Sequence, residues 1–361
     1  MQGHATLANW LRLTLTPGIG GETQRKLLGA FGLPDLIFSA GRGALRGVVG
    51  ERLADLLLDT DNRAAVDGAL AWAEDQGHEI VTLGVTAYPT ALLEIPDPPT
   101  LIYVRGRIEL LQRPALAIVG SRNPTPQGIR NAESFAAALA EAGLIVTSGL
   151  ALGIDAAAHR AALDVSGGTV AFIGTGIDRI YPARNRDLAL RISEVGCVVS
   201  EFPLGTPAAA HNFPRRNRLI SGFSRGVLVV EAAVESGSLI TARLAGEQGR
   251  EVFAIPGSIH AAQSRGCHKL IRQGAKLVET VQDILDELSW VSTGKTPVSV
   301  SAATPDDSIL ALIGFDPCSL DELSERAGLS IAALSPRLLQ LELEGRLASL
   351  PGGRIQRLSK V

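Results

Sequence analysis

Six short apolar segments, separated by stretches with helical spacing, dominate the middle of this 361-residue sequence. The segments are residues 115–119, 144–147, 169–173, 197–200, 227–230 and 251–255. Each is an almost continuous apolar run, which is typical of strands covered on both faces. Helical patterns such as 127–142 and 238–247 lie between them. This alternation predicts an α/β fold built on an extended Rossmann-type, doubly wound parallel sheet.

The segments on either side of this region have other patterns. Residues 1–75 consist of Leu-rich helical stretches broken by Gly and Pro, which predicts a helical N-terminal domain. The strand–helix alternation predicts a Rossmann-type domain over residues 76–290. Residues 291–306 are rich in Ser, Thr, Pro and Val and predict a linker, which is followed by a C-terminal domain over residues 307–361.

The cysteines and the apolar runs indicate the cellular compartment. Cys197, Cys267 and Cys318 are isolated in the sequence, which suits the reduced thiols of cytoplasmic proteins. No uninterrupted apolar run reaches the roughly 18 residues of a membrane span. The N-terminus lacks the basic segment and the cleavage pattern of a signal peptide. We therefore expect a cytoplasmic protein without a membrane partner.

The residues that follow the six strands bear on function, because ligands of an open parallel sheet bind beyond the carboxyl ends of its strands. Five of the six strand ends carry Gly, which lets the backbone approach a ligand closely. A single Gly is explained by its turn, but several at one edge favour a binding site. Neither G-x-x-x-x-G-K-[ST] nor a G-x-G-x-x-G after the first strand occurs, so no nucleotide cofactor is expected.

One long segment of the chain carries no acidic residue. The whole chain is slightly acidic, with 34 Lys and Arg, 37 Asp and Glu and a net charge of -3, yet residues 202–230 contain no Asp or Glu. The polar and aromatic residues of this segment include His211, Asn212, Phe213, Arg215, Arg216, Asn217, Arg218 and Arg225. Nucleic-acid binding depends on where charges lie rather than on net charge. Residues 211–225 therefore predict a local basic site on the ligand edge of the sheet.

The combination of arginine and phenylalanine favours single-stranded DNA. Guanidinium groups pair with phosphates and stack on bases, and Phe213 adds an aromatic face. A single strand exposes its base faces, whereas a duplex does not. Arg184 and Arg186, in the loop after the third strand, extend the basic group. The alternative interpretation is a solvated helix start whose arginines pair with distant acids.

A helix that begins after the fifth strand offers a second candidate for phosphate binding. Ser236, Gly237 and Ser238 stand at its start, where unpaired backbone amides suit a phosphate. Ser238 could equally be only the residue that caps the helix. Both interpretations have equal support.

Carboxylates near the strand ends allow a catalytic or a structural role. Glu201 and Glu231 each follow a strand. They could form a catalytic pair, or they could hold arginines such as Arg122 in position, and the second role is favoured. Asp155 and His159 lack the spacing of metal ligands, so no metal site is expected.

Seven short motifs occur in order along the middle region. They are V-G-S-R at 119–122, S-G-L-A-L-G-I-D-A-A-A-H at 148–159, G-T-G-I-D-R-I-Y-P at 174–182, F-P-R-R-N-R-L-I at 213–220, V-V-E-A at 229–232, S-G-S-L-I-T at 236–241 and F-A-I-P-G at 253–257. In this combination the chain resembles the DNA-processing protein A family, DprA/Smf. The resemblance implies a homodimeric, non-enzymatic protein that binds single-stranded DNA, protects incoming DNA and loads the recombinase RecA during natural transformation.

The resemblance also implies roles for individual residues. The residues that would contact DNA are Gly120, Ser121, Arg122, Phe213, Arg215, Asn217 and Arg218. The family often has Lys where this chain has Ala183, and Arg184 or Arg186 could replace that contact. The dimer candidates, which could instead belong to the core, are Leu270, Ile271, Leu277 and Val278.

The flanking regions resemble known small domains. Residues 15–21, with the sequence L-T-P-G-I-G-G, resemble the hairpin of a helix-hairpin-helix element, and the N-terminal region is similar to the SAM-like extension of family members. Such a hairpin offers backbone amides to phosphates, or serves only as a packing module.

Residues 319–358 resemble a winged-helix domain. Its second helix offers Arg337 and Gln340 against Glu342 and Glu344, and residues 304–361 hold eight acidic and six basic side chains. We therefore expect this domain to bind a partner or to tune the dimer rather than to read DNA. The Ser-Pro pair at 335–336 predicts that a helix starts there.

A nucleotide-processing enzyme is the alternative to a DNA-binding protein. Rossmann-type phosphoribohydrolases are similar in overall pattern and use P-G-G-x-G-T-x-x-E. The matching place in this chain is residues 236–241, and Leu244 stands where the motif has its Glu. The missing acid argues against hydrolysis.

Overall fold

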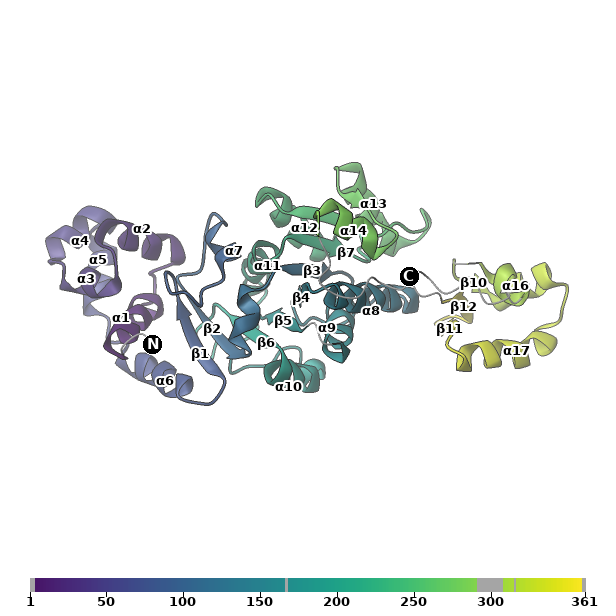
Figure 1. The fold of residues 1–361 in the computed structure, drawn as a ribbon, viewed down its shortest axis with the longest axis horizontal. Coiled ribbons are helices and arrows are strands. Elements are labelled where there is room, and N and C mark those ends of the chain that lie inside the picture. The colour runs from purple at the N-terminus through teal and green to yellow at the C-terminus, as the bar shows by residue number, and fades with distance from the viewer. Residues whose placement is uncertain (1–3, 166–167, 291–307, 315, 359–361) are drawn as a thin grey trace.

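Helices make up the N-terminal part of the chain. The computed structural model describes residues 4–165, 168–290, 308–314 and 316–358. The first six helices are α1 (His4–Leu15), α2 (Gly21–Phe31), α3 (Pro34–Ser39), α4 (Arg42–Val49), α5 (Glu51–Asp59) and α6 (Arg63–Ala73). They bury an apolar core of their own around Leu27, Ile37, Leu45 and Leu57. Figure 1 shows α1 and α6 beside the first two strands of the sheet.

The middle of the chain forms one nine-stranded sheet. Its strands are β1 (His78–Thr82), β2 (Leu101–Gly106), β3 (Ala115–Val119), β4 (Ile145–Ser148), β5 (Thr169–Phe172), β6 (Cys197–Ser200), β7 (Gly226–Val229), β8 (Glu251–Ala254) and β9 (Lys276–Leu277). The order across the sheet is β1-β2-β6-β5-β4-β3-β7-β8-β9. The predicted α/β class is confirmed, and all six predicted strands lie within one residue of their expected bounds.

The sheet is not parallel throughout. β1 pairs antiparallel with β2, and β2 pairs antiparallel with β6. The other seven strands, in the order β6-β5-β4-β3-β7-β8-β9, are parallel to their neighbours. Three of the five residues of the edge strand β1 are not buried. Such an edge strand lacks the continuous apolar run of a strand covered on both faces, which is why the sequence pattern did not reveal it.

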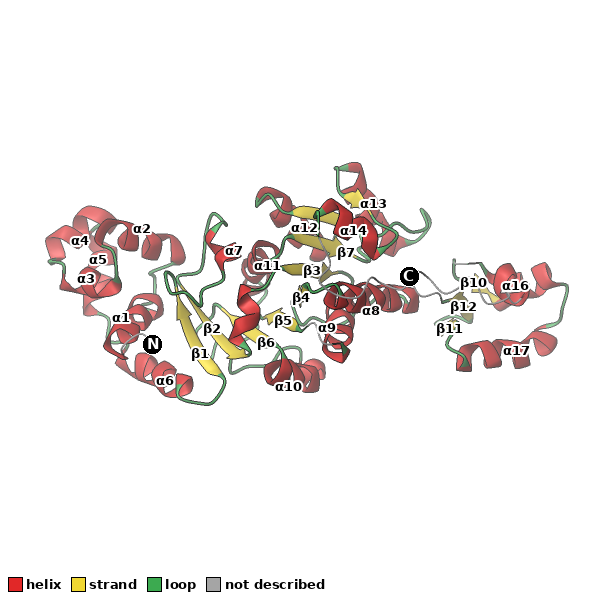
Figure 2. Cartoon of the chain, viewed as in Figure 1, coloured by secondary structure: helices red, strands yellow, loops and turns green. Residues whose placement is uncertain are grey.

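Helices cover both faces of the sheet, as Figure 2 shows. The helices of this part are α7 (Thr90–Leu93), α8 (Pro126–Glu141), α9 (Ile154–Asp164), α10 (Arg186–Val195), α11 (Asn212–Phe223), α12 (Ser238–Glu247), α13 (Arg265–Arg272) and α14 (Val281–Glu287), with short 3₁₀ turns at Ile108–Gln112, Ala183–Asn185 and Ala262–Ser264. Alternate residues of β3 pack into different cores. Ala117 and Val119 pack with α11 and α12, and Leu116 and Ile118 pack with α8 and α9.

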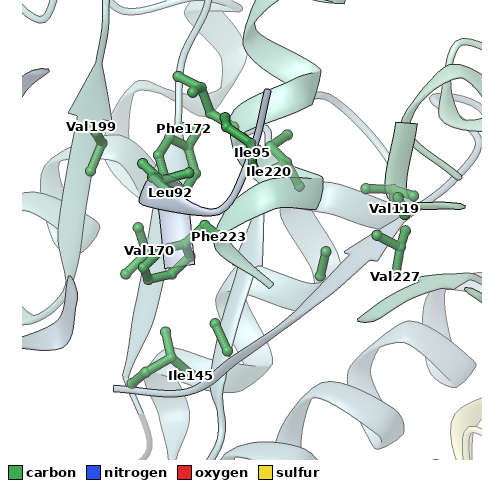
Figure 3. Packing of buried hydrophobic residues seen from close by; sticks show 14 of the residues in the cluster. Leu92, Ile95, Val119, Ile145, Val170, Phe172, Val199, Ile220, Phe223 and Val227 are labelled. Atoms are coloured by element: carbon green, nitrogen blue, oxygen red, sulfur yellow. The ribbon is translucent and has the colours of Figure 1, made fainter. Parts of the chain in front are cut away.

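The core beneath α11 holds that helix firmly on the sheet. Its residues Leu219, Ile220 and Phe223 are buried, and Phe223 meets the ring of Phe172 edge-on at 5.4 Å between centroids. Figure 3 shows Ile220 and Phe223 beside Phe172 and Leu92. Burial of three large apolar side chains stabilises the position of α11 by several kcal/mol, at roughly 1.5–3 kcal/mol each. The start of α11 is thereby fixed relative to the strand ends.

The C-terminal residues form the predicted winged-helix domain. Its elements are α15 (Ser308–Ile313), β10 (Cys318–Ser319), α16 (Leu320–Ala327), α17 (Ile331–Leu343), β11 (Leu347–Leu350) and β12 (Arg354–Arg357), and its sheet has the order β10-β12-β11. The predicted linker at residues 291–306 lies outside the described residues.

The helix start predicted at residues 335–336 is wrong. α17 begins at Ile331 and continues through Pro336. Leu334, Leu338 and Leu341 are buried on one side of this helix, and their packing offsets the backbone hydrogen bond that Pro cannot donate. Among the described residues, no helix is long and apolar enough to cross a membrane.

His159 gives a testable consequence of the packing of α9 on the sheet. The ring is fully buried, and its Nδ1 lies 2.7 Å from Oγ1 of Thr169. That hydroxyl donates to the carbonyl of Val146 at 2.7 Å, so the ring nitrogen donates to the hydroxyl. Burial lowers the pKa of His159 from 6.5 to about 3.

Because this pKa is lowered, the neutral ring contributes stability above pH 6.5 that is lost as the pH falls below that value. We expect the free energy of unfolding of the wild type to fall by about 2 kcal/mol more than that of His159→Gln between pH 7.5 and pH 5. Urea denaturation of both proteins at the two pH values checks this. Equal pH dependence of the two proteins would contradict it.

Candidate nucleic-acid interface

The order of the strands reverses at β3, and this creates a crevice. β4, β5 and β6 lie on one side of β3, and β7 and β8 lie on the other. The helices that follow β3 and β7 pack on opposite faces of the sheet, so their connecting loops diverge beyond the carboxyl ends. Ligands of open α/β sheets bind at such a switch point.

A groove of about 690 Å³ occupies this crevice. The groove brings together three of the predicted segments. These are residues 119–123 at the end of β3 and after it, residues 213, 214, 216 and 217 in the first turns of α11, and residues 235–238 at the start of α12. A smaller hollow of about 60 Å³ adjoins it between Arg122, Phe213 and the loop at Tyr181.

The first turn of α11 presents its arginines on two different faces. Arg216 turns toward the centre of the sheet and donates to the carbonyls of Gly149 at 2.5 Å and Phe172 at 2.6 Å. Arg215 and Arg218 turn toward the end of β6, where both contact Glu201. The acid-free segment is therefore divided between one face that borders the groove and another that is ion-paired.

Arg225 does not belong to the interface, although it was predicted there as part of residues 211–225. It follows α11 and immediately precedes β7, so it lies at the opposite edge of the sheet, where its amide donates to the carbonyl of Ala115 at 2.8 Å. Its guanidinium lies 5.7 Å from the ring centre of Trp290. A helix of 12 residues spans about 18 Å, which separates the two ends of the basic segment.

Phe213 is the aromatic centre of the candidate site. Its ring is partly buried, and the guanidinium carbons of Arg122 and Arg216 lie 5.9 Å and 6.0 Å from the ring centre. The ring of Tyr181 lies 5.6 Å away, tilted by 37°, and is 47% exposed. A Cβ at Gly174 would come within 3.0 Å of the Phe213 ring, so any larger residue there would press against this ring.

Arg216 is buried but still charged at neutral pH. Burial lowers its pKa to about 10, and the nearby carboxylate of Asp155 opposes that shift. Burial raises the pKa of Asp155, and Arg216 opposes this shift in turn. The pair therefore stabilises two charges that would be costly to bury separately.

The loop after β4 is held in a strained conformation beside these charges. Leu150 has a φ of 56°, which is unfavourable for a residue with a branched side chain. Asn185 donates its amide to the carbonyls of Leu150 and Ala151 at 2.9 Å and 3.1 Å. Asp155 accepts from the amide of Gly149 at 3.1 Å. Sequence reasoning did not identify Asn185 or the pairing of Asp155 with Arg216, although all three residues lie within or next to the quoted motifs.

The loop after β3 places Arg122 at the mouth of the groove. The carbonyl of Ser121 accepts from the amide of Ile154 at 3.1 Å, and a Cβ at Gly120 would come within 2.7 Å of Ile154. The loop is thus packed against the start of α9. Arg122 is exposed, and no acidic side chain in the described part of the chain forms an ion pair with it.

The other predicted contact residues differ in whether they border the groove. Asn217 borders the groove, and its Oδ1 accepts from Nε of Arg216 at 3.1 Å. Arg218 is nearly buried, lies 2.5 Å from Glu201 and also donates to the carbonyl of Asp97. Arg184 and Arg186 are exposed at the start of α10 and line neither the groove nor the hollow.

The residues before α12 face the groove with their own hydrogen bonds. The hydroxyls of Ser236 and Ser238 lie 2.7 Å apart, and the amide of Ser238 donates to Oγ of Ser236 at 3.3 Å. A Cβ at Gly237 would meet open space. The prediction that Ser238 caps the helix is wrong, because Gly237 is the capping residue, no side chain caps the helix and Ser238 is its first residue. Phosphate binding at this helix start stays a prediction.

The two carboxylates at the strand ends have different partners. Glu201 lies 3.0 Å from Arg215 and 2.5 Å from Arg218, so it holds arginines, but not Arg122. Glu231 accepts from the amide and the hydroxyl of Thr125 at 2.9 Å and 2.6 Å, and burial raises its pKa. Glu231 therefore fixes the start of α8 rather than an arginine.

The four dimer candidates divide between core and surface. Leu270 and Val278 are buried in the two cores of the sheet, and Ile271 is partly buried. Leu277, on the edge strand β9, is 43% exposed. Among the described residues, no group of His, Cys, Asp and Glu is arranged to hold a metal ion.

Comparisons with known proteins agree with this architecture. The family model of DNA recombination-mediator protein A matches residues 79–289, and the model of the DprA winged helix domain matches residues 293–353. Protein Smf of Escherichia coli is 43% identical over 81% of each chain. DNA processing protein DprA of Streptococcus pneumoniae is 49% identical over 56% of this chain and 72% of that protein.

Two solved structures extend the comparison. The structure of DprA from Streptococcus pneumoniae aligns with 77% of this chain and 97% of its own, with 38% identity and a TM-score of 0.70. The structure of DNA processing protein A from Helicobacter pylori, which describes a single-stranded DNA binding mode, aligns with 60% of this chain and 97% of its own, with 29% identity and a TM-score of 0.54. The chain belongs to the DNA recombination-mediator protein A family, known as DprA or Smf.

Proposed function

We propose that the groove at the switch point binds single-stranded DNA. The observation that carries this proposal is an exposed arginine, Arg122, which has no acidic partner among the residues that the structure describes and lies beside the partly buried ring of Phe213. A guanidinium and an aromatic face are the two groups that bind a phosphate and an adjacent unstacked base. The related protein of Helicobacter pylori, whose structure describes a single-stranded DNA binding mode, supports the assignment.

The contacts divide into binding and positioning roles. Arg122, with Gly120 and Ser121, contacts the phosphate, and Phe213 stacks on a base. Ser236, Gly237 and Ser238 lie across the groove and take a second phosphate. Asn217 contacts the strand from the face of α11 that borders the groove.

The remaining predicted arginines act less directly. Arg218 is buried on Glu201, and it positions α11 rather than touching DNA. Arg215 is half exposed beside the same carboxylate and reaches the strand beyond the groove. Arg184 and Arg186 attract DNA from a distance, as exposed cations at the start of α10.

We predict that Arg122→Ala weakens binding of a dT oligomer and reduces the slope of log K against log salt by about 0.7, because one phosphate contact is lost. Phe213→Ala should weaken binding by roughly 1–3 kcal/mol, because a stacked base loses its platform. Fluorescence anisotropy over a salt series measures both effects.

The matched control is Arg225→Ala, which removes an exposed arginine of the same acid-free segment at the opposite edge of the sheet. Its affinity and salt slope should equal those of the wild type. Duplex binding as tight as single-strand binding, or equal losses for Arg122→Ala and Arg225→Ala, would reject the assignment.

The protein further acts as a mediator that protects incoming DNA and loads RecA onto it during natural transformation. The description of the matched family as recombination mediators and the relatives named as DNA processing proteins support this role. A mediator must bind the strand without cutting it. Of the two carboxylates that directly follow strands, Glu201 is paired with two arginines and Glu231 is hydrogen-bonded to Thr125, and both arrangements suit a binding protein. Of the carboxylates that line the groove, Asp155 accepts from the amide of Gly149, and Glu235 is exposed. The cytoplasm, where RecA acts, is the expected compartment.

We predict that the wild-type protein shortens the lag of RecA ATP hydrolysis on single-stranded DNA that is already coated with a single-strand-binding protein. Arg122→Ala should restore most of the lag, because the mediator no longer reaches the DNA, and Arg225→Ala should act like the wild type. A lag that is unchanged by saturating wild-type protein would rule out RecA loading.

A homodimer is the expected assembly, with a second copy of the chain at the β9 edge of the sheet. Leu277 is exposed there. An adjacent groove of about 710 Å³ between α12 and α13 is lined by both apolar and charged residues, among them Leu239, Leu270 and Lys269. Of the four dimer candidates, Leu277 is the most exposed, so we expect it to contact the partner, whereas Ile271 is partly buried.

We predict that Leu277→Glu shifts the protein from dimer to monomer in sedimentation equilibrium, because a charge would be buried at the contact. Leu339→Glu is the matched control, since Leu339 is 58% exposed on α17 of the winged-helix domain, and it should sediment like the wild type. A wild-type monomer, or an unchanged dimer in Leu277→Glu, would exclude this interface.

A further inference from the structure

A second cavity, of about 440 Å³, lies where the N-terminal helices meet the sheet. One wall is the hairpin of residues 14–21 that leads into α2. The other wall consists of Thr100, Leu101 and Tyr103 on the β2 side and of Glu201, Phe202, Pro203 and Arg215. The groove for DNA shares none of these residues, so the cavity is a separate feature.

The hairpin that lines this cavity ends in a tight turn and the start of a helix. Gly18 has a φ of 83°, and the amide of Ile19 donates to the carbonyl of Thr16, which closes a tight turn. α2 then begins at Gly21 without a side-chain cap. In the described chain, no acceptor is bonded to the amides of Gly20 and Gly21. Unpaired amides at the start of a helix attract an anion.

Two buried polar atoms on the opposite wall also have no partner. Tyr103 and Glu201 line the cavity, and within the described part of the chain the hydroxyl of Tyr103 and Oε2 of Glu201 make no hydrogen bond, although Tyr103 is 1% exposed and the Glu201 side chain 7%. An unsatisfied buried polar group costs about 1–3 kcal/mol. A phenol that donates and a carboxylate that accepts are the partners that the polar edge of a nucleobase needs.

Charge and aromatic surface at this wall suit a nucleotide as well. Glu201 is neutralised by Arg215 and Arg218, and Arg218 also pairs with Asp97 at 3.1 Å. The guanidinium of Arg215 lies 5.4 Å from the ring centre of Phe202. An anion therefore meets the cation of Arg215 beside the amides of the hairpin, and it does not meet an unpaired carboxylate.

The cavity and the groove lie on opposite sides of the first turn of α11. Pro214 and Arg216 border the groove, whereas Arg215 borders the cavity. A single strand that leaves the groove across this turn passes Arg215 and arrives at the hairpin. The two sites can therefore be occupied by one strand.

We propose that the cavity is a second subsite for single-stranded DNA, in which the hairpin amides bind a phosphate and Tyr103 and Glu201 bind the base. This inference rests on the proposed binding of single-stranded DNA in the groove. It assigns the N-terminal domain a direct part in holding the strand.

Gly21→Pro tests the phosphate contact, because it deletes one amide at a position where Pro is compatible with a helix. Pro is favoured at the first position of a helix, and the preceding residue, Gly20, has the extended ψ of 169° that precedes Pro well. Tyr103→Phe tests the base contact by removing only the hydroxyl. The matched control, Gly41→Pro, deletes an exposed amide before α4, where the φ of -65° suits Pro.

Affinities for dT oligomers of increasing length give the readout. We expect Gly21→Pro and Tyr103→Phe to bind long oligomers roughly tenfold more weakly than the wild type, because each loses one hydrogen bond to a charged or buried group. Both variants should bind the shortest oligomers like the wild type. Gly41→Pro should match the wild type at every length. Hydrogen exchange of the wild type should show protection of residues 15–23 by long oligomers alone.

Wild-type affinity of both variants for long oligomers, or no protection of the hairpin, overturns the second subsite and leaves the groove assignment intact. Loss of binding at every length in Arg122→Ala, with length-dependent loss in Gly21→Pro, supports both sites. A wild-type protein that binds no single-stranded DNA overturns both proposals together.

Discussion

The buried guanidinium of Arg216 is the interaction on which the geometry of the interface depends. It donates to the carbonyls of Gly149 and Phe172 and lies close enough to Asp155 for each charge to oppose the shift in the other's pKa. These partners belong to the loop after β4, the end of β5 and the start of α9. One side chain of α11 therefore joins three segments that are far apart in the sequence. Removing it would leave the buried carbonyls of Gly149 and Phe172 without this donor, at about 1–3 kcal/mol for an unsatisfied group. Asp155 would keep its backbone donors but lose the nearby positive charge.

The arginines of this chain show why net charge is a poor guide to DNA binding. Arg216 and Arg218 are buried and hold the protein together, while Arg122 is exposed and has no acidic partner among the described residues. An ion pair with a protein carboxylate would have to be broken before an arginine could bind a phosphate. The chain has a net charge of -3, but the cation at the mouth of the groove is already available. Local placement of one unpaired charge outweighs the small excess of acids elsewhere.

The sequence predicted the central strands well because each is buried on both faces and thus apolar throughout. It missed the edge strand β1 because β1, with Glu79 exposed, does not show that pattern. It also missed β2, although the first four residues of that strand are buried and apolar and could have been recognised. The acid-free segment correctly indicated α11, yet the sequence could not separate Arg216 from Arg215, since adjacent residues of a helix point about 100° apart. Arg225 was misplaced for a related reason, because its distance from the groove depends on the length of α11.

The strain in the loop after β4 is consistent with a binding site that is formed before its ligand arrives. A positive φ at Leu150 costs on the order of 1–2 kcal/mol, and Gly149 accepts no side chain because Arg216 occupies that space. Asn185, Asp155 and Arg216 each hold this loop from a different element. Together these hydrogen bonds exceed the cost of the strain. The loop, and with it the surroundings of Phe213, therefore needs little ordering when a strand binds, so that less of the contact energy is lost to entropy.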